Sequence, residues 1–467
     1  MTTLYYCKRC FELRRENALL KAENARLKAH LREQKRSALE GAFGASTPSA
    51  KIPIKPNTWA DRQGRRGGGT VGHAGHGRAT VSEAEADRVE RVAFPDSTCP
   101  DCGGKLLSAG LRSRTVCDLR PQRVERVALQ LECKRCPKCR RRWVARAPGV
   151  LPKALYTNRL LAHVAEQHYL HGIPLGVIER QSGLAHGALL SAFRQLAGRL
   201  GKAVETLSGE YRRAPVRHAD ETGWRTDGKN GYVWLFATTA MSLFRFRGTR
   251  SATVPAEVLG KNPLPGVLVV DRYHAYNHAP AALQYCYSHL KRDTEALLKE
   301  YPDDPEVAAF VASLTPVLAE AMTLRTLGLP RKEFLRRAAR TKRRILAIVH
   351  RQARHEAIQK IQNIFRKNPH RLYHWARDPS IPAENNLAER DLRPLVVARK
   401  VSFGSQSEAG ARTRETLMSL LHTLKKRRAP VADTLHAALD RLAGNPALDP
   451  YPLLFPSPKP KRPSSPS

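Results

Sequence analysis

The sequence predicts a multidomain α+β protein, in which an α/β domain with a helical insertion follows a coiled coil, a zinc ribbon and a helical region. Three observations predict this class: a leucine repeat near the N-terminus, two cysteine pairs after it, and strand-like segments carrying aspartate near the middle. The 467 residues are enough for several domains and at least one large core. The hydrophobic content of 42% indicates that most of the chain folds.

The chain is strongly basic. Its 80 Lys and Arg outnumber 42 Asp and Glu, which gives a formal net charge of +38. Such an excess repels itself unless a polyanion neutralises it, and nucleic acid is the usual polyanion. We therefore expect a nucleic acid as partner, and a merely soluble basic protein is the alternative.

The N-terminus carries Cys7, Lys8, Arg9 and Cys10 where a signal peptide would have an apolar run. No stretch of about eighteen apolar residues suggests a membrane span. Most of the nine cysteines lie in short-spaced pairs, which fits metal binding in a reducing compartment better than disulfides. The expected location is the cytoplasm.

Residues 1–42 are expected to hold a CxxC motif and a short coiled coil. Leucine and asparagine occupy the two seam positions of a heptad, with Leu13, Leu20 and Leu27 at one and Asn17, Asn24 and Leu31 at the other. This pattern is typical of a parallel two-stranded coil, whereas a single solvated helix is the alternative because so few heptads are present. Cys7 and Cys10 supply only two ligands, so they are idle or are completed by the partner strand.

Residues 43–95 predict a flexible basic linker, rich in Gly, Pro, Ser and Arg, that can follow a phosphate backbone. His73 and His76 have the spacing of metal ligands, but a linker without a metal is favoured there.

Residues 96–150 predict a zinc ribbon. Two CPxC turns, Cys99–Cys102 and Cys136–Cys139, each offer two thiolates to a tetrahedral zinc ion. Cys133 competes with Cys139, because Cys133 and Cys136 also form a CxxC. Cys139 is preferred since its pair repeats the composition of the first turn, and Cys117 is expected to pack in a core.

Residues 151–212 predict several helices, broken near His171–Pro174 and at Ser182–Gly183. A helix, a short glycine turn and a second helix are compatible with a helix-turn-helix reader of DNA. Simple packing of helices explains the pattern equally well.

Residues 213–405 predict the α/β domain. A strand from Pro215 ends in Asp220, a hairpin follows in GYVWLFATTA and SLFRFRGTR, and a helix covers residues 251–260. The apolar run that begins at Gly266 and ends in Asp271 predicts a buried central strand. Three strands, a helix and a fourth strand, with aspartate on the first and fourth, is the order of the ribonuclease-H-like fold.

Asp220 and Asp271 are candidate metal ligands. A charged carboxylate at the tip of a buried strand is costly unless a cation or hydrogen bonds satisfy it. Mg²⁺ prefers carboxylate and phosphate oxygens, and two such ions support phosphodiester cleavage. Each aspartate alone could equally be a turn or cap residue, whereas the pair in a basic chain favours catalysis.

A third carboxylate is expected from a helix, in PAENNLAERDLRP. Glu389 would lie about one turn inside this helix and is preferred as third ligand, while Glu384 precedes the helix and is the second choice. Basic residues nearby are expected to bind DNA phosphates, namely Arg390, Arg393, Arg399 and Lys400.

The segment between Asp271 and Glu389 is too long for the basic fold. Its excess is helical and basic, which predicts a helical insertion at about residues 297–374. Further helices are expected over residues 406–447, with a disordered tail over residues 448–467.

Several segments resemble the transposases of the insertion sequence sixty-six family: HADETGWR, GVLVVDRYHAY, PAENNLAERDLRP and RKVSFGSQSEAGARTRETLMSLLHT. The likeness extends upstream to the cysteine pairs, to GHAGHGR and to EQHYLHGIPL, and so covers nearly the whole chain. Cys286, His289 and Arg292 in QYCYSHLKR resemble a further family motif of uncertain role.

The resemblance implies a DNA transposase of the three-carboxylate (DDE) type, associated with the bacterial nucleoid, that cleaves and joins double-stranded DNA at insertion-sequence ends. It implies Mg²⁺ (or Mn²⁺) at Asp220, Asp271 and Glu389, and the cysteine ribbon implies structural Zn²⁺. A homo-oligomer is expected, with proteins encoded by the same element as candidate accessory partners. The rivals are a domesticated DNA-binding regulator and a ribonuclease-H-like nuclease without strand transfer.

Overall fold

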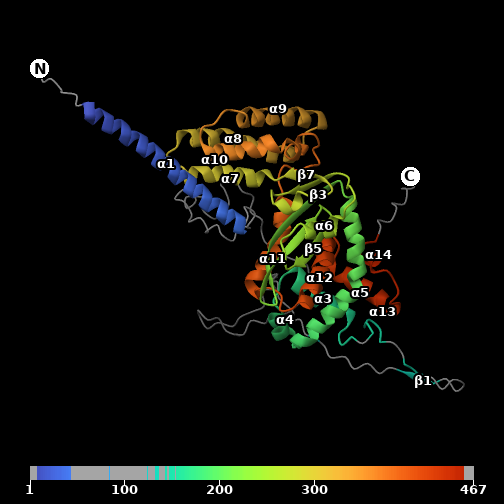
Figure 1. The fold of residues 1–467 in the computed structure, drawn as a ribbon. Coiled ribbons are helices and arrows are strands. Elements are labelled where there is room, and N and C mark those ends of the chain that lie inside the picture. Colours follow the sequence, from blue (N-terminus) through green and yellow to red (C-terminus); the bar gives the residue numbers. More distant parts are fainter. Residues whose placement is uncertain are drawn as a thin grey trace, which may run out of the picture. The chain divides into compact units, whose positions relative to one another are not determined.

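The computed structural model describes residues 8–43, 132–135, 142–144, 147–152 and 154–456, together with Ala84 and Val124 (Figure 1). The chain divides into two units, residues 1–51 with 128–467 and residues 52–127. All helices and strands given below belong to the first unit.

The first helix is α1, Lys8–Phe43, so a helix is present where residues 1–42 were predicted to hold a short coiled coil. The heptad leucines Leu13, Leu20 and Leu27 are each 54–55% exposed in the single chain. An apolar seam left in solvent is what a pairing helix requires, and pairing itself stays a prediction.

Two short antiparallel strands, β1 (Cys133–Arg135) and β2 (Arg142–Val144), pair with Cys133 opposite Val144. The predicted zinc ligands Cys99, Cys102, Cys136 and Cys139 lie outside the described residues. The zinc ribbon and the linker with His73 and His76 therefore remain predictions.

A helical region precedes the sheet and breaks where the sequence predicted. It contains α3 (Asn158–Ala165), a π-helical turn η2 (Glu166–Leu170), α4 (Leu175–Ser182) and α5 (His186–Arg213). Gly183 ends α4 in the left-handed conformation, at φ 70°, which glycine adopts without strain. The α4–turn–α5 geometry agrees with the predicted break, and DNA reading by α5 stays a prediction.

The central sheet has five strands in the order β5-β4-β3-β6-β7. They are β3 (Val216–Thr226), β4 (Lys229–Ala237), β5 (Ser242–Arg247), β6 (Val267–Val270) and β7 (Ala282–Tyr285). β4 runs antiparallel to both β3 and β5, whereas β3, β6 and β7 are mutually parallel. The helix α6 (Thr253–Leu259) connects β5 to β6, so the predicted order of three strands, a helix and a fourth strand is present.

The predicted end of the first strand is wrong. β3 does not stop at Asp220 but continues to Thr226, and a two-residue turn at Asp227–Gly228 joins it to β4. Both turn residues have positive φ, 52° and 70°, as a type I′ hairpin requires. The polar residues after Asp220 suggested that the strand had ended. Glu221 and Thr222 are nevertheless buried, because they contact residues that are distant in the sequence.

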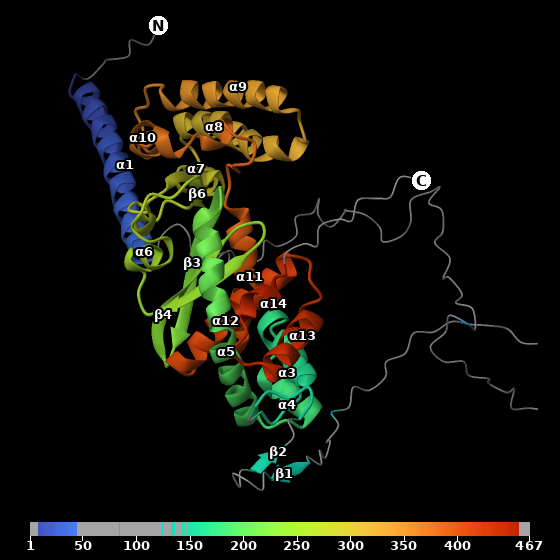
Figure 2. The ribbon, with the colours of Figure 1, turned by 90° about the vertical axis from the view of Figure 1, so that its right-hand side faces the viewer.

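The sheet is followed by α11 (Asn386–Ser402), α12 (Glu408–Lys426), α13 (Val431–Gly444) and α14 (Pro450–Leu454). α11 and α12 pack on the sheet, whereas α13 packs against α3 (Figure 2) and α14 against α5. α12 and α13 agree with the helices predicted over residues 406–447. The disordered tail predicted over residues 448–467 is wrong where α14 forms, because Leu454 and Phe455 are buried in the core. α12 borders the outer strand β5, whose backbone N–H groups at Ser242, Phe244 and Phe246 donate to side chains on that helix. The acceptors are Thr423, Ser419 and Glu415, which are spaced one turn apart on one face.

Between β7 and α11 the chain forms α7 (Tyr287–Glu300), α8 (Pro305–Thr323), α9 (Arg331–Val349) and α10 (Glu356–Lys367). The short 3₁₀ turn η4 (Leu324–Leu327) follows α8. Among the helices that the structure describes, α8 with η4 is long and apolar enough to cross a membrane by length and composition alone. Its buried residues, among them Val307, Leu314 and Leu318, pack in the same core as those of α9, as expected of a central helix in a bundle.

Candidate active site

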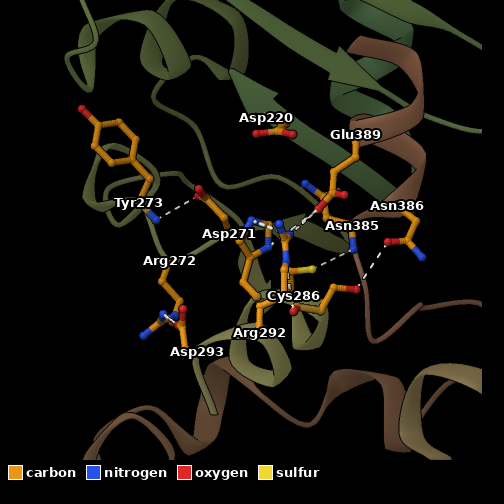
Figure 3. Close-up of polar contacts among 12 residues, drawn as sticks. Asp220, Asp271, Arg272, Tyr273, Cys286, Arg292, Asp293, Asn385, Asn386 and Glu389 are labelled. Carbon is orange, nitrogen blue, oxygen red and sulfur yellow. Dashed lines mark hydrogen bonds and ion pairs between the residues drawn. The ribbon is translucent and has the colours of Figure 1, made fainter. Parts of the chain in front are cut away.

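Asp220 and Asp271 lie on neighbouring parallel strands at the same level. β3 and β6 pair with Val216 opposite Val267 and His218 opposite Val269, so the same offset places Asp220 level with Asp271. Asp271 follows the last residue of β6, and both residues are buried, with 5% and 4% exposure. The Asp220 carboxylate accepts a backbone hydrogen bond of 2.9 Å from Glu221. The Asp271 carboxylate accepts one of 2.9 Å from Tyr273 (Figure 3).

Glu389 reaches the same site from the first turn of α11 (Figure 3). Its side chain is 32% exposed, and its Oε1 accepts a hydrogen bond of 3.1 Å from Arg292 of α7. Glu384, the second choice for the third acid, precedes this helix, and its pKa is raised by burial. Glu389, and not Glu384, is among the acids that act on Asp220.

The pKa of Asp220 reflects how close the other acids lie. Burial raises the pKa of Asp220 well above its ordinary value, and the neighbouring charges of Glu221, Asp271 and Glu389 raise it further. In the part of the chain that the structure describes, no Lys or Arg pairs with Asp220. Carboxylates that repel one another in a buried site are a donor set suited to hard divalent cations, so these residues fit Mg²⁺.

Glu221 is a buried acid that the sequence reasoning missed. Its Oε1 accepts hydrogen bonds of 3.0 and 2.6 Å from Arg250, and its Oε2 accepts one of 2.6 Å from Tyr276. Burial and the charge of Asp271 nevertheless raise the pKa of Glu221 to about 7. Arg250 also stacks on Tyr273, 3.9 Å from the ring centre, so one arginine links Glu221 to the loop that follows Asp271.

Asn385 connects the elements that carry the acids. Its Nδ2 donates to the carbonyl of Ala219 at 2.8 Å, its backbone N–H donates to Cys286 Sγ at 3.1 Å, and its Oδ1 lies 2.8 Å from His218 Nδ1. Burial lowers the pKa of His218 to about 4, so the ring is neutral and its Nδ1–H donates to Asn385. The side chain of Asn385 therefore holds β3 beside α11, a role that the sequence reasoning missed.

Cys286, His289 and Arg292 surround Glu389 on its other side. Cys286 is a buried free cysteine at the junction of β7 and α7, and His289 and Arg292 lie on α7. One guanidinium nitrogen of Arg292 lies 3.1 Å from both His289 Nε2 and Glu389 Oε1. Burial, Arg292 and Arg272 lower the pKa of His289 to about 3, which keeps its imidazole neutral.

The residues predicted to bind DNA divide into two groups. Arg390, Arg393 and Lys400 are exposed on α11. Arg399 is half-buried and donates to Thr222 Oγ1 at 3.2 Å and to the carbonyl of Gly223 at 2.6 Å. The structure therefore gives Arg399 partners within the protein, where it fastens α11 to β3.

Comparison with known proteins finds a matching family model and similar proteins. The family model described as "Transposase IS66 family" matches residues 153–413, which include the whole sheet and all three acids. "Uncharacterized protein y4qI" of Sinorhizobium fredii is 28% identical over 418 residues, which are 77% of this chain and 73% of that protein. "Uncharacterized protein y4jO" of the same organism is 44% identical over 48 residues, 10% of this chain and 15% of that protein.

Proposed function

Because the chain belongs to the Transposase IS66 family, we propose that it is a DNA transposase that cleaves insertion-sequence ends and joins them to a target. The proposed catalytic domain is ribonuclease-H-like, with α8–α10 as its helical insertion. The observation that carries the proposal is the meeting of Asp220, Asp271 and Glu389 from two parallel strands and one helix.

Asp220, Asp271 and Glu389 would hold Mg²⁺ or Mn²⁺. When bound, a pair of such ions activates the attacking oxygen and stabilises the leaving oxygen of a phosphodiester. The protein contributes a rigid set of acceptors, because Asp220 and Asp271 are each fixed by a backbone N–H. Glu389 is fixed less tightly, since its partner Arg292 is a half-exposed side chain, 42% accessible.

Glu221 and Asn385 serve as positioning residues in this proposal. Glu221 is held by Arg250 and Tyr276, so it keeps β3 and the Asp271 loop in register without needing a metal ion. Asn385 fixes the start of α11 against the residue before Asp220, and so sets where Glu389 stands.

The DNA is expected to lie along exposed basic residues of two helices. On α11 these are Arg390, Arg393 and Lys400. On α9 the exposed basic residues are Arg331, Lys332, Arg336, Arg337, Arg340, Arg343 and Arg344. Phosphate contacts of this kind supply affinity and position rather than sequence reading.

We also propose that the cysteine ribbon holds structural Zn²⁺ and that the protein is a homo-oligomer paired through α1. Its further partners would be accessory proteins encoded by the same element, and its location would be the cytoplasm, at the nucleoid.

A strand-transfer assay tests the function. The full chain, the cognate element ends and Mg²⁺ should give both nicked ends and joined products, whereas EDTA should give neither. Cleavage without joining would identify a nuclease, and end binding without cleavage would identify a regulator.

A further inference from the structure

We propose that Cys286, His289 and Glu389 form a binding site for a soft divalent cation of the zinc class. The site shares Glu389 with the carboxylate site but differs from it in its other donors. Binding at this site stands on its own geometry, and only its effect on catalysis rests on the proposed function.

Three ligand atoms converge here from two elements. Cys286 Sγ, His289 Nδ1 and a Glu389 carboxylate oxygen all lie within 4.8 Å of one another, and His289 Nδ1 lies 3.9 Å from Glu389 Oε1. Cys286 and His289 are three residues apart across the first turn of α7, which places them on one face. Ligands of a tetrahedral zinc ion stand roughly 3.5 Å apart, so a closure of about 1 Å would complete the set.

An independent observation points to a ligand. His289 Nδ1 is buried and has no hydrogen-bond partner among the residues that the structure describes, and its side chain is only 6% exposed. A buried polar nitrogen left unpaired is costly, and a cation between it and Glu389 would remove that cost. Thiolate, imidazole and carboxylate together are zinc ligands, whereas Mg²⁺ takes oxygen alone.

Arg292 controls access to the site. It now donates to Glu389 Oε1 and to His289 Nε2, so Nε2 is an acceptor and the ring proton is on Nδ1. Zinc binding needs the Nδ1 lone pair, so Arg292 must turn outward and the ring proton must move to Nε2. The thiol proton of Cys286 is released to solvent as the Zn–S bond forms, while the N–H of Asn385 continues to donate to the sulfur.

The consequence is competition. Zinc bound through Glu389 Oε1 would draw this carboxylate toward Cys286 and His289 and away from Asp220 and Asp271, so zinc at this site would inhibit Mg²⁺-dependent cleavage. The inhibition would be relieved by zinc chelation and not by more DNA.

The test is zinc content of the full chain after equilibration with Zn²⁺ and gel filtration. Ser288→Ala is the matched control, because Ser288 lies between the two ligands in the sequence. Wild type and this control should each hold one more zinc equivalent than Cys286→Ser or His289→Gln. Any ribbon zinc contributes equally to all four proteins. Arg292→Gln should retain its zinc against a chelator several-fold better than wild type.

A second measurement covers variants that fold poorly. Crystals of wild type with Zn²⁺ should show anomalous density at the zinc edge among Cys286, His289 and Glu389. Equal zinc contents together with density only between Asp220 and Asp271, or no density, would overturn the proposal. Cleavage with Mg²⁺ alone is scored separately: zinc binding without cleavage would refute the proposed function and leave this site standing.

Discussion

At the scale of the residue, the three acids differ in how firmly the fold holds them. Asp220 and Asp271 are buried at the sheet. Glu389 is partly exposed on a helix and is paired with Arg292, a long side chain that is itself partly exposed. Two fixed ligands and one adjustable ligand would allow the site to close around DNA after it binds.

Replacement of each acid by its amide should separate catalysis from binding. Asp220→Asn, Asp271→Asn and Glu389→Gln should each reduce cleavage by several orders of magnitude, because an amide is a poor ligand for Mg²⁺. End binding in a gel-shift assay should change little, since these side chains hold metal and not DNA. Glu384→Gln is the matched control, and loss of cleavage in it with full activity in Glu389→Gln would show that Glu384 is the third acid.

The acid cluster should make the metal-free protein less stable as pH rises. Burial raises the pKa of Asp220 well above its ordinary value and that of Glu221 to about 7. A group with a raised pKa binds its proton more tightly in the folded state, so its favourable contribution is lost as pH rises through the folded pKa.

Urea unfolding in EDTA should therefore show a free energy of unfolding that falls as pH rises from about 4.5, the ordinary pKa of glutamate, to about 7, the raised pKa of Glu221. The loss should be about 1.4 kcal/mol for each unit of pKa shift. Asp220→Asn should flatten this fall, and Mg²⁺ should oppose it at the higher pH. The same slope in wild type and Asp220→Asn would mean that Asp220 is not the group that titrates.

The sequence predicted the acids whose position in a strand or helix has a local pattern. It missed the acid whose burial depends on residues distant in the chain. Asp271 ends an apolar strand and Glu389 follows a helix start, so both could be identified from local pattern. Glu221 looked like the residue after a strand, because Arg250 and Tyr276, which make its burial possible, are 29 and 55 residues away. No local pattern reports a partner at that separation.

At the scale of the element, α11 is placed by one side chain. Asn385→Ala would leave the carbonyl of Ala219 and the Nδ1–H of His218 without partners, at a cost of about 1–3 kcal/mol for each group. We expect a lower melting temperature and a higher Mg²⁺ concentration for half-maximal cleavage, because Glu389 moves with the helix.

Asn386→Ala is the matched control, since Asn386 is the neighbouring exposed residue. If Asn385→Ala lowered stability alone, with an unchanged Mg²⁺ midpoint, then Asn385 would hold the fold and not the metal site.

α12 protects the outer edge of the sheet. Thr423→Val keeps the side-chain shape but removes the acceptor of the buried Ser242 N–H, which should destabilise the protein by about 1–3 kcal/mol. Urea unfolding measures the loss, and Thr413→Val on the same helix, whose hydroxyl bonds only within α12, is the comparison. Equal losses of unfolding free energy in both variants would mean that the hydrogen bond from β5 to Thr423 does not add to stability.

The sequence predicted helices and strands well where the apolar residues recur with a regular period. It predicted them poorly where tertiary contacts determine how far an element extends. The helices of the insertion, and α12 and α13 near the C-terminus, follow from their pattern, whereas α14 lies where a disordered tail was predicted. The length of β3 did not, although the Asp227–Gly228 turn was present in the sequence as a signal for the hairpin.

At the scale of the whole molecule, the charge of +38 should appear as a steep salt dependence. Log K for end binding should fall with log salt by roughly 0.9 for each phosphate contacted. Removal of residues 1–80 should reduce that slope and, if the α1 leucines pair, weaken joining of two ends more than binding of one. Unchanged slope and unchanged two-end synapsis would show that this segment is neither a DNA tether nor a pairing helix.

The cover that α12 provides for β5 also has a consequence for synthesis on the ribosome. The strand ends at Arg247, and the last of its acceptors, Thr423, is translated 176 residues later (423 − 247). At about 5–20 residues per second the nascent chain carries an open strand edge for roughly ten seconds or more. Such an edge can recruit the same strand of another nascent chain on the same messenger, so a message truncated before α12 would yield aggregates in place of a shorter soluble protein.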